Sequence, residues 1–381
     1  MNTLAPALDA AAPTRAARWS QRLPLAIAVL ALFGWLLWSV SARQALLLLV
    51  GVGLGAVLAG ARFGFTTGWR MLVEQRDPAG VYGQLLLLAL LSALSMPLLA
   101  RFPETTAALG PLSVSLLVGA FVFGLCMQIA DGCGSGTLYK AGLGHPVSLA
   151  VFPAFVAGSF LGAAHQDAWL SLGALPAVSL TDVLGAHATV LLQLAVLAAI
   201  ATLLWAKRRT TTSRWQGRGV YVGAVLLAVF AIANLIVAGQ PWGIVYGLGL
   251  WGAKLVSWAG VDLTANAFWG REAQQAQIAG SLLDDVTSVT NLGLLLGSFL
   301  FAWRRRAACP SVAPMAPAQW MWVIGAGLVL GYSARLAFGC NVGAYFSGIA
   351  SGSLHGWVWF ACAFAGSMLG VRLRARVELK G

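Results

Sequence analysis

The chain has 381 residues, of which 59% are hydrophobic and 9% charged, and its formal net charge is +12. A soluble domain carries about 25% charged residues, so this composition excludes a soluble protein and indicates a polytopic membrane protein. The positive charge does not indicate a nucleic-acid partner, because the cations gather at the ends of apolar blocks and no aromatic-interleaved basic face accompanies them.

Most apolar blocks are close to the length of a membrane-spanning helix, about 20 residues. We therefore expect helices at about 23–41, 44–61, 81–100, 114–130, 146–165, 187–206, 219–240, 241–258, 286–303, 320–338 and 354–371. The first block follows Arg15, Arg18 and Arg22 and is nearly of spanning length. It is interpreted as a retained first helix rather than a cleaved signal peptide.

Basic residues in the loops 207–218 and 304–319 place these loops and both termini in the cytoplasm. Between Arg218 and Arg304 there are three apolar blocks, where only two crossings fit. We predict that block 241–258, which opens with Pro241-Trp-Gly, is re-entrant. The predicted organisation is a cytoplasmic tail (1–22), a first membrane half (23–206), a basic cytoplasmic linker (207–218), a second membrane half (219–371) and a basic cytoplasmic tail (372–381).

The two halves share a Gly-Cys pair and a later Ala-Gly-Ser-x-Leu-Gly motif. The matched residues are Gly132-Cys133 with Gly339-Cys340 and Gly136 with Gly343, each 207 residues apart, and 157–162 with 365–370, 208 residues apart. In the topology above, blocks 114–130 and 320–338 run in opposite directions. The sequence thus predicts two inverted repeats, an architecture that builds a substrate site near the bilayer midplane.

Each Gly-Cys pair lies at a helix break and is followed by a Gly-rich segment too short to span. Irregular backbone survives at membrane depth only where protein or a watery cavity satisfies its polar groups. Helix N-termini suit an anion, and a thiol is soft and polarizable, so we predict a path for an anion that also carries sulfur or selenium. The residues predicted to line it are Cys133, Cys340, Gly132, Gly134, Ser135, Gly136, Gly339, Asn341, Gly343, Arg335 and Lys254.

Charge inside an apolar block is costly and marks a pathway or a pair. Arg335 and Lys254 are predicted to attract the anion, although long cationic side chains can also anchor at the interface. Secondary candidates are Cys126, Lys140, Arg62, His145 and His355. For these, alternatives stay open: helix packing for Cys126, an ion pair with Asp131 for Lys140, and helix capping for the histidines. Cys309, in a basic loop, is interpreted as incidental to function. Cys362, within an apolar block, is interpreted as a helix-packing residue.

Several motifs are missing from the sequence. It has no P-loop, no His-Glu-x-x-His and no Gly-x-Ser-x-Gly. The five cysteines form no Cys-x-x-Cys pair, which argues against a zinc site or a disulfide framework. We expect no metal, no cofactor and no enzymatic activity.

Four stretches resemble the YeeE/YedE family of sulfur-transport inner-membrane proteins. They are Phe123-Gly-Leu-Cys-Met-Gln-Ile-Ala-Asp-Gly-Cys-Gly-Ser-Gly-Thr-Leu-Tyr139, Pro241-Trp-Gly243 with Leu250-Trp-Gly-Ala-Lys254, Asp285-Val-Thr-Ser-Val-Thr-Asn-Leu-Gly293 and residues 331–357 around Cys340. The resemblance implies an all-α fold of two inverted halves, with re-entrant or broken helices, forming an hourglass-like central path with cysteines at its constrictions. It further implies a bacterial inner membrane, import of thiosulfate by weak non-covalent contacts with the thiols, and a cytosolic SirA/TusA-type sulfur-carrier protein as partner.

The chain departs from that family at 61–69. Thiosulfate-importer-like members often carry another cysteine after the arginine, whereas Gly64 or Phe65 stands here after Arg62. The leading prediction is a permease that imports thiosulfate. The alternatives are transport of a selenium compound or of another sulfur oxyanion, a membrane thiol sulfurtransferase that hands sulfur to a cytosolic carrier, and a scaffold that anchors a sulfur-relay partner.

Overall fold

The computed structural model describes residues 15–208, 218–305 and 314–379, and for 15–26 only the backbone. Arg209, Arg214, Arg306 and Cys309, and with them most of the predicted basic linker, lie outside the described residues. The long helices are α1 (Arg15–Ser39), α2 (Ala42–Ala61), α4 (Ala79–Arg101), α5 (Val114–Ile129), α7 (Pro146–Ala164), α10 (Ala186–Lys207), α11 (Arg218–Ala238), α14 (Val286–Arg305), α15 (Pro317–Leu336) and α17 (Leu354–Arg376).

Shorter elements connect the long helices or interrupt them. These are α3 (Phe65–Gln75), α6 (Gly134–Gly142), α8 (Gln166–Leu170), α9 (Leu180–Leu184), α12 (Val245–Trp258), α13 (Glu272–Ala279), η1 (Leu282–Asp284), η2 (Asn341–Phe346), which is a π-helical turn, and α16 (Ser347–Ala350). The strands β1 (Pro111–Ser113) and β2 (Ala174–Ala177) pair antiparallel. The described chain is therefore almost entirely helical, as the sequence predicts.

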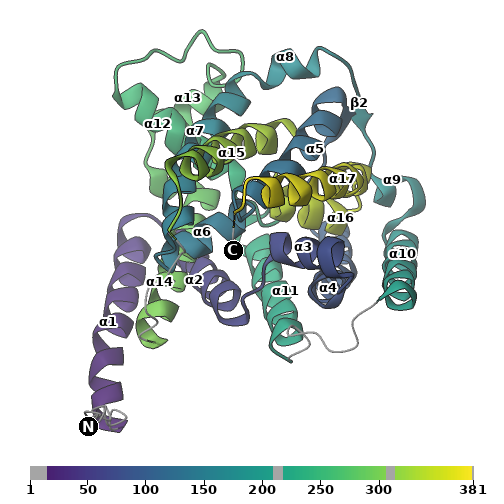
Figure 1. Ribbon diagram of the computed structural model, residues 1–381. Coiled ribbons are helices and arrows are strands. Elements are labelled where there is room, and N and C mark those ends of the chain that lie inside the picture. The colour runs from purple at the N-terminus through teal and green to yellow at the C-terminus, as the bar shows by residue number, and fades with distance from the viewer. Residues whose placement is uncertain (1–14, 209–217, 306–313, 380–381) are drawn as a thin grey trace, which may run out of the picture.

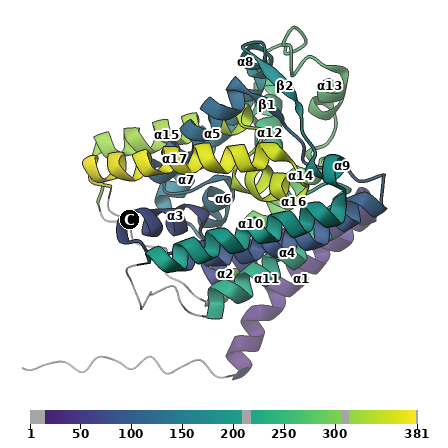
Figure 2. The same ribbon diagram turned by 90° about the vertical axis from the view of Figure 1, so that its right-hand side faces the viewer.

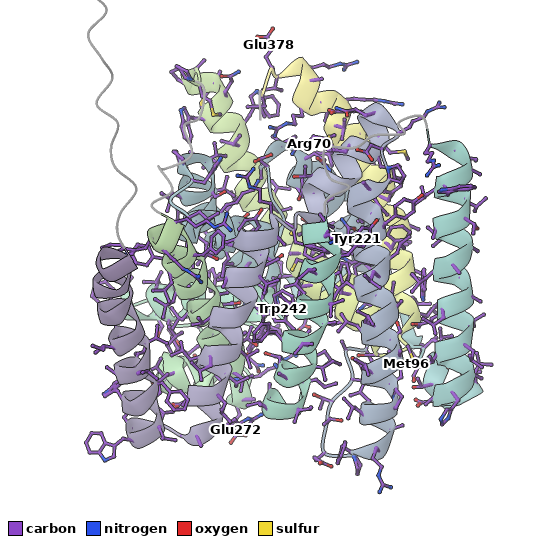
Figure 3. The ribbon with its side chains drawn as sticks, turned by 90° about the horizontal axis from the view of Figure 1, so that it is seen from below. Arg70, Met96, Tyr221, Trp242, Glu272 and Glu378 are labelled. Atoms are coloured by element: carbon purple, nitrogen blue, oxygen red, sulfur yellow. The ribbon has the colours of Figure 1, made fainter. Side chains whose placement is uncertain are left out.

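Among the described residues, nine helical segments are long and apolar enough to cross a membrane. Each predicted block contains a helix, and most ends lie within a few residues of the expected positions. The exception is α1, which begins at Arg15, eight residues before the predicted start at 23. α12 has 14 residues and is not one of the nine segments, which fits the re-entrant interpretation of 241–258. In Figures 1 and 3, α1 and α10 lie at opposite edges of the helical body.

Two features were not expected from the sequence. One is α3, which lies between two predicted blocks. It was not predicted because Thr66, Thr67 and Arg70 interrupt its apolar pattern. The other is the pair of short strands, whose register contains an irregularity at Pro111. Both occur where the chain leaves a long helix, so block counting alone could not find them.

The helices pack reciprocally. α5 packs on α17 and α15 packs on α7; α2 packs on α14 and α11 packs on α4; α5 also meets α15, and α2 meets α11. If α5, α7, α2 and α4 are exchanged for α15, α17, α11 and α14, the same set of pairs results. Figures 1 and 2 both show α5, α7, α15 and α17 gathered on one side of the body, with α2, α4 and α11 on the other. Reciprocal packing of this kind is what the predicted pair of inverted repeats would produce.

The Ala-Gly-Ser-x-Leu-Gly motifs make the close contacts of this arrangement. A Cβ on Gly158 would lie 1.9 Å from the carbonyl oxygen of Leu328, and a Cβ on Gly366 would lie 1.9 Å from that of Phe121. The first contact joins α7 to α15 and the second joins α17 to α5. Small residues allow such close approach of membrane helices, and the two motifs do so at equivalent places.

The short helices α3 and α12 also hold equivalent places. α3 packs on α17 and α12 packs on α7. The indole of Trp69 in α3 donates a hydrogen bond to Gln84 (2.9 Å), and the indole of Trp251 in α12 donates one to Ser288 (2.8 Å). Each half therefore contains one short helix held by a tryptophan to the long helix that follows it.

Candidate functional site

The two Gly-Cys turns have nearly the same backbone. Cys133 has φ −90° and ψ −170°, and Cys340 has φ −90° and ψ −167°. Two residues earlier, Asp131 and Phe338 both adopt left-handed conformations, with φ of 55° and 60°. Because such conformations cost free energy for non-glycine residues, their recurrence indicates that the fold requires this turn in both halves.

The turns bring the two predicted cysteines together. Both thiols are fully buried, and α6 contacts η2. A Cβ built on Gly134, next to Cys133, would lie 3.0 Å from the sulfur of Cys340. The thiols of the two halves therefore share one region at the centre of the molecule.

Polar groups surround the thiols, and two of the side chains among them have no partner within the residues that the structure describes. The backbone amide of Gly136 lies within hydrogen-bonding reach of the Cys133 sulfur, and those of Val342 and Gly343 lie within reach of the Cys340 sulfur. The side-chain amide of Asn341 is buried and makes no hydrogen bond to the described residues, and neither does the buried hydroxyl of Thr137. Buried polar groups normally have partners, so these donors favour a polar ligand here.

The remaining predicted glycines and serine stand in the same turns. The hydroxyl of Ser135 lies 3.4 Å from the sulfur of Cys133. The amides of Gly132 and Gly339 close the turns by donating hydrogen bonds to Met127 (3.1 Å) and Ala334 (2.8 Å). A Cβ on Gly343 would meet no atom within 4 Å, so the chain is open beside this residue.

Arg335 occupies a separate position on α15, before the second turn. Its guanidinium donates to the side chain of Gln166 (3.1 Å) and lies over the rings of Tyr246 and Phe268, at 5.5 and 5.1 Å from their centroids. No carboxylate pairs with it in the described part of the chain, and its Nε has no hydrogen-bond partner there. Aromatic faces stabilise a cation without neutralising it, which leaves this charge available to an anion.

Asp131 lies at the centre of a cationic cluster next to the first turn. Its carboxylate pairs with Arg70 (2.7 Å), Lys140 (2.7 Å) and Arg374 (3.5 Å). The ion pair between Lys140 and Asp131, which the sequence left open, is therefore present. Lys140 also donates to the backbone oxygen of Asp131 (2.6 Å) and so closes the turn.

Other predicted residues are engaged elsewhere. Lys254 donates to the backbone oxygens of Ile278 (2.9 Å) and Gly280 (2.6 Å), at the C-terminal end of α13. The ring of His355 is buried, and its Nδ1 is hydrogen-bonded to the hydroxyl of Ser353 (2.6 Å). Cys126 is buried in the apolar core. A role for these three in the path remains a prediction.

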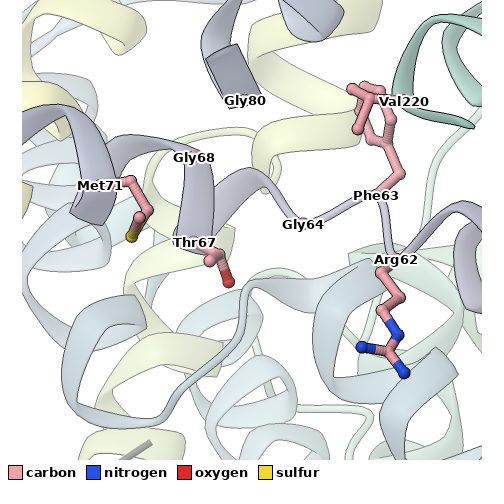
Figure 4. Close-up of a pocket in the computed structure, with 8 residues that line it drawn as sticks. All are labelled: Arg62, Phe63, Gly64, Thr67, Gly68, Met71, Gly80 and Val220. Atoms are coloured by element: carbon pink, nitrogen blue, oxygen red, sulfur yellow. The ribbon is translucent and has the colours of Figure 1, made fainter. Parts of the chain in front are cut away.

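Two further candidates border α6 and α3. Burial lowers the pKa of His145, which precedes α7, and nearby Lys140 lowers it further. Arg62 ends α2 and borders a pocket that also contains Phe63, Thr67, Met71 and Val220. In Figure 4, Phe63 and Val220 lie together while the guanidinium of Arg62 points away from them.

Sequence reasoning missed several residues of this region, namely Gln128, Arg70, Arg374 and Thr137. Gln128 donates to the hydroxyl of Ser367 (2.7 Å) and accepts from Arg70 (3.1 Å). The repeat could have found two of them. Gln128 stands 207 residues before Arg335, and Arg374 stands 208 residues after Gln166. These are the offsets of the two motifs, so the pair Gln128–Arg374 corresponds to the pair Arg335–Gln166.

Comparison with known proteins gives consistent results. A family model described as "Sulphur transport" matches residues 60–369. The chain is 27% identical over 337 residues to the thiosulfate transporter TsuA of Spirochaeta thermophila, covering 82% of this chain and 93% of that protein. It is 25% identical over 341 residues to the thiosulfate transporter TsuA of Escherichia coli, covering 82% and 89%. It is 31% identical over 159 residues to the probable transporter YedE of Escherichia coli, covering 42% and 37%.

Proposed function

Because this chain belongs to the sulphur transport family, we propose that it is a membrane permease that imports a small sulfur-containing anion, and that thiosulfate is its substrate. The observation that carries the proposal is the meeting of Cys133 and Cys340, with donors that lack partners beside them. Two relatives that match over most of their length are named thiosulfate transporters, which supports the choice of substrate.

The chemistry of the site suits thiosulfate. Its oxygens carry the negative charge and accept hydrogen bonds from the Asn341 amide and from backbone N–H groups. Its terminal sulfur is soft and polarizable, as thiols are, so Cys340 and Cys133 contact that end. Sulfate offers only oxygens and gains nothing from the thiols.

The proposed path is inward. Arg335 attracts the dianion at the outer mouth, Cys340 and then Cys133 contact its sulfur, and the anion leaves past the first turn. Each contact is weak, because conduction requires exit as well as entry. Both thiols are fully buried, which argues against covalent transfer of sulfur directly from them to a protein carrier.

The orientation belongs to the same proposal. The basic ends of α14 and α17 face the cytoplasm by the positive-inside rule, and the two halves cross the bacterial inner membrane in opposite directions. The reciprocal packing of α5 with α17 and α15 with α7 supports the inverted arrangement. A cytosolic SirA/TusA-type carrier that takes over the imported sulfur is a further prediction.

The test is uptake of radiolabelled thiosulfate by cells that lack their own sulfate and thiosulfate importers and express this chain. Parallel measurements use sulfite, sulfate and a selenium analogue of thiosulfate. We expect thiosulfate uptake well above that of cells with an empty vector, and little sulfate uptake. No thiosulfate uptake from a protein that is present in the membrane would refute the proposed substrate.

A further inference from the structure

The cationic cluster around Asp131 carries more charge than its one carboxylate balances. Asp131 faces three cations, whose side chains are 12% (Arg70), 18% (Lys140) and 7% (Arg374) exposed. Glu74 also interacts with Arg374 but is itself exposed. Three largely buried cations thus share one largely buried carboxylate. The buried groups alone carry an excess of about two positive charges, which the exposed Glu74 offsets in part.

An excess of buried charge is costly unless something compensates it. The distances show which cation is least compensated. Arg70 and Lys140 each lie 2.7 Å from Asp131, whereas Arg374 lies 3.5 Å away and donates instead to the backbone oxygen of Gln128 (2.8 Å). Arg374 therefore ties α17 to α5, yet its charge is the one that Asp131 neutralises least.

The repeat of the two motifs gives Arg374 a counterpart. By the motif offsets, Gln128 in the first half corresponds to Arg335 in the second, and Gln166 in the first half corresponds to Arg374 in the second. In each case the arginine contacts the glutamine. Arg374 on α17 donates to the backbone of Gln128 on α5, and Arg335 on α15 donates to the side chain of Gln166, which begins α8 just after α7. Each end of the proposed path therefore presents one arginine beside one glutamine.

The two arginine sites lie toward opposite ends of the molecule. Figure 3 shows Arg70, a member of the cluster, near one end of the long helices, close to Glu378 at the C-terminal end of the described chain. Glu272, which begins α13, lies near the other end. Phe268, whose ring contacts Arg335, is four residues from Glu272. The cluster, marked by Arg70, and the α13 region near Arg335 thus lie toward opposite ends of the long helices.

We propose that Arg70, Lys140 and Arg374 form a second anion subsite, at the inner mouth of the path, which receives the dianion from Cys133. This proposal rests on the proposed function for the identity of the anion. Asp131 holds the three cations in place when the subsite is empty. The incoming dianion neutralises the excess charge beside Asp131, and water entering from the cytoplasm releases it.

The experiment measures thiosulfate transport in proteoliposomes that contain the protein in one orientation, with substrate added from either face. Arg374→Gln, which copies Gln166 of the other half, should raise KM at the inner face by about ten-fold, as expected from the loss of one charge-assisted hydrogen bond. KM at the outer face should stay the same. Arg335→Gln should give the opposite pattern.

Lys140→Gln is the second variant, and it should also raise KM at the inner face alone. Arg372→Gln is the matched control, because Arg372 is exposed on the same helix two residues from Arg374, and it should change neither KM. If Arg374→Gln and Lys140→Gln raised KM equally at both faces, or at neither face, the inner subsite would be ruled out.

A second measurement separates this proposal from the proposed function. If the wild-type protein transported no thiosulfate, the assignment of substrate would fail while the subsite could still be examined. The unfolding temperature in detergent would then be followed with added sulfate or thiosulfate. Protection of the wild type but not of Arg374→Gln supports the subsite, and equal protection of both, or of neither, overturns it.

Discussion

The sulfur of Cys340 lies against the backbone of Gly134, so that a Cβ at position 134 would be 3.0 Å from it. This contact joins the two halves at the centre of the proposed path. Gly134→Ala should displace the thiol and lower thiosulfate uptake, with a loss of stability of about 1–3 kcal/mol, the usual cost of overpacking. Uptake and unfolding temperature are the measurements. Gly325→Ala on α15, where a Cβ meets no atom within 4 Å, should behave as wild type.

The two thiols should contribute separately to transport. Cys133→Ala and Cys340→Ala each remove one contact worth about 1 kcal/mol, so each should lower uptake roughly five-fold. Cys362→Ala is the control, because Cys362 is only partly buried on α17 and lies outside the turns. Wild-type uptake from both single variants, at equal amounts of protein in the membrane, would contradict the role of the thiols.

The reciprocal glycines should be equally sensitive. Gly158→Ala and Gly366→Ala place a methyl group 1.9 Å from a backbone oxygen of the facing helix, which forces the helices apart. Both variants should lower the unfolding temperature in detergent by similar amounts. Gly219→Ala, whose Cβ would meet nothing within 4 Å, provides the reference. A large effect in one half only would argue against equivalent packing.

Asp131→Asn should destabilise the protein strongly, by about 3–5 kcal/mol, because it leaves buried cations without their counter-charge. The neutral amide keeps the size of the side chain, so the effect reports charge. Added thiosulfate should recover more stability in this variant than in the wild type, since the anion then supplies the missing charge. Thermal unfolding with and without thiosulfate checks both expectations. An unchanged unfolding temperature would show that the ion pairs contribute little.

The stability of the protein should depend on pH partly through His145. Burial lowers its pKa in the folded state below the usual 6.5, so the unfolded state binds more protons in the pH range just below that value. Folding is therefore favoured as pH rises through this range, and the contribution is lost on acidification. His145→Gln should flatten the pH dependence of the unfolding temperature between about pH 5 and 7. An identical profile in the variant would exclude this contribution.

The sequence predicted the long helices well because the length of an apolar block is a strong signal. It also predicted the matched turns, because glycine and cysteine recur at one offset. α3 was missed for a physical reason: its polar residues Thr66 and Arg70 face neighbours that appear only after folding. Thr66 is buried against the core, and Arg70 reaches Gln128 and Asp131.

The candidate site was predicted unevenly. The turns of Cys133 and Cys340 were expected to lie together, and the sulfur of Cys340 does lie against Gly134, next to Cys133; that the thiols line a path stays a prediction. Lys254 was expected to line the path because it is charged within an apolar block, and this stays a prediction; its ammonium group donates to backbone oxygens at the C-terminal end of α13. Sequence could not distinguish these two roles, because both require a cation at the end of a short helix. Arg374 was assigned only to a basic tail, since no local pattern connects it to Asp131.

The left-handed residues at positions 131 and 338 occupy the same place in the two turns, yet one is an acid among three cations and the other is an apolar ring. The turn of the first half is therefore the more electropositive of the two. With that turn facing the cytoplasm, as proposed, a dianion enters against an inside-negative voltage that opposes it by about 2.3 kcal/mol per charge per 100 mV. A local positive field at the far end lowers the energy of the anion at that point of the path, so the difference between the two turns acts where the voltage opposes the anion most.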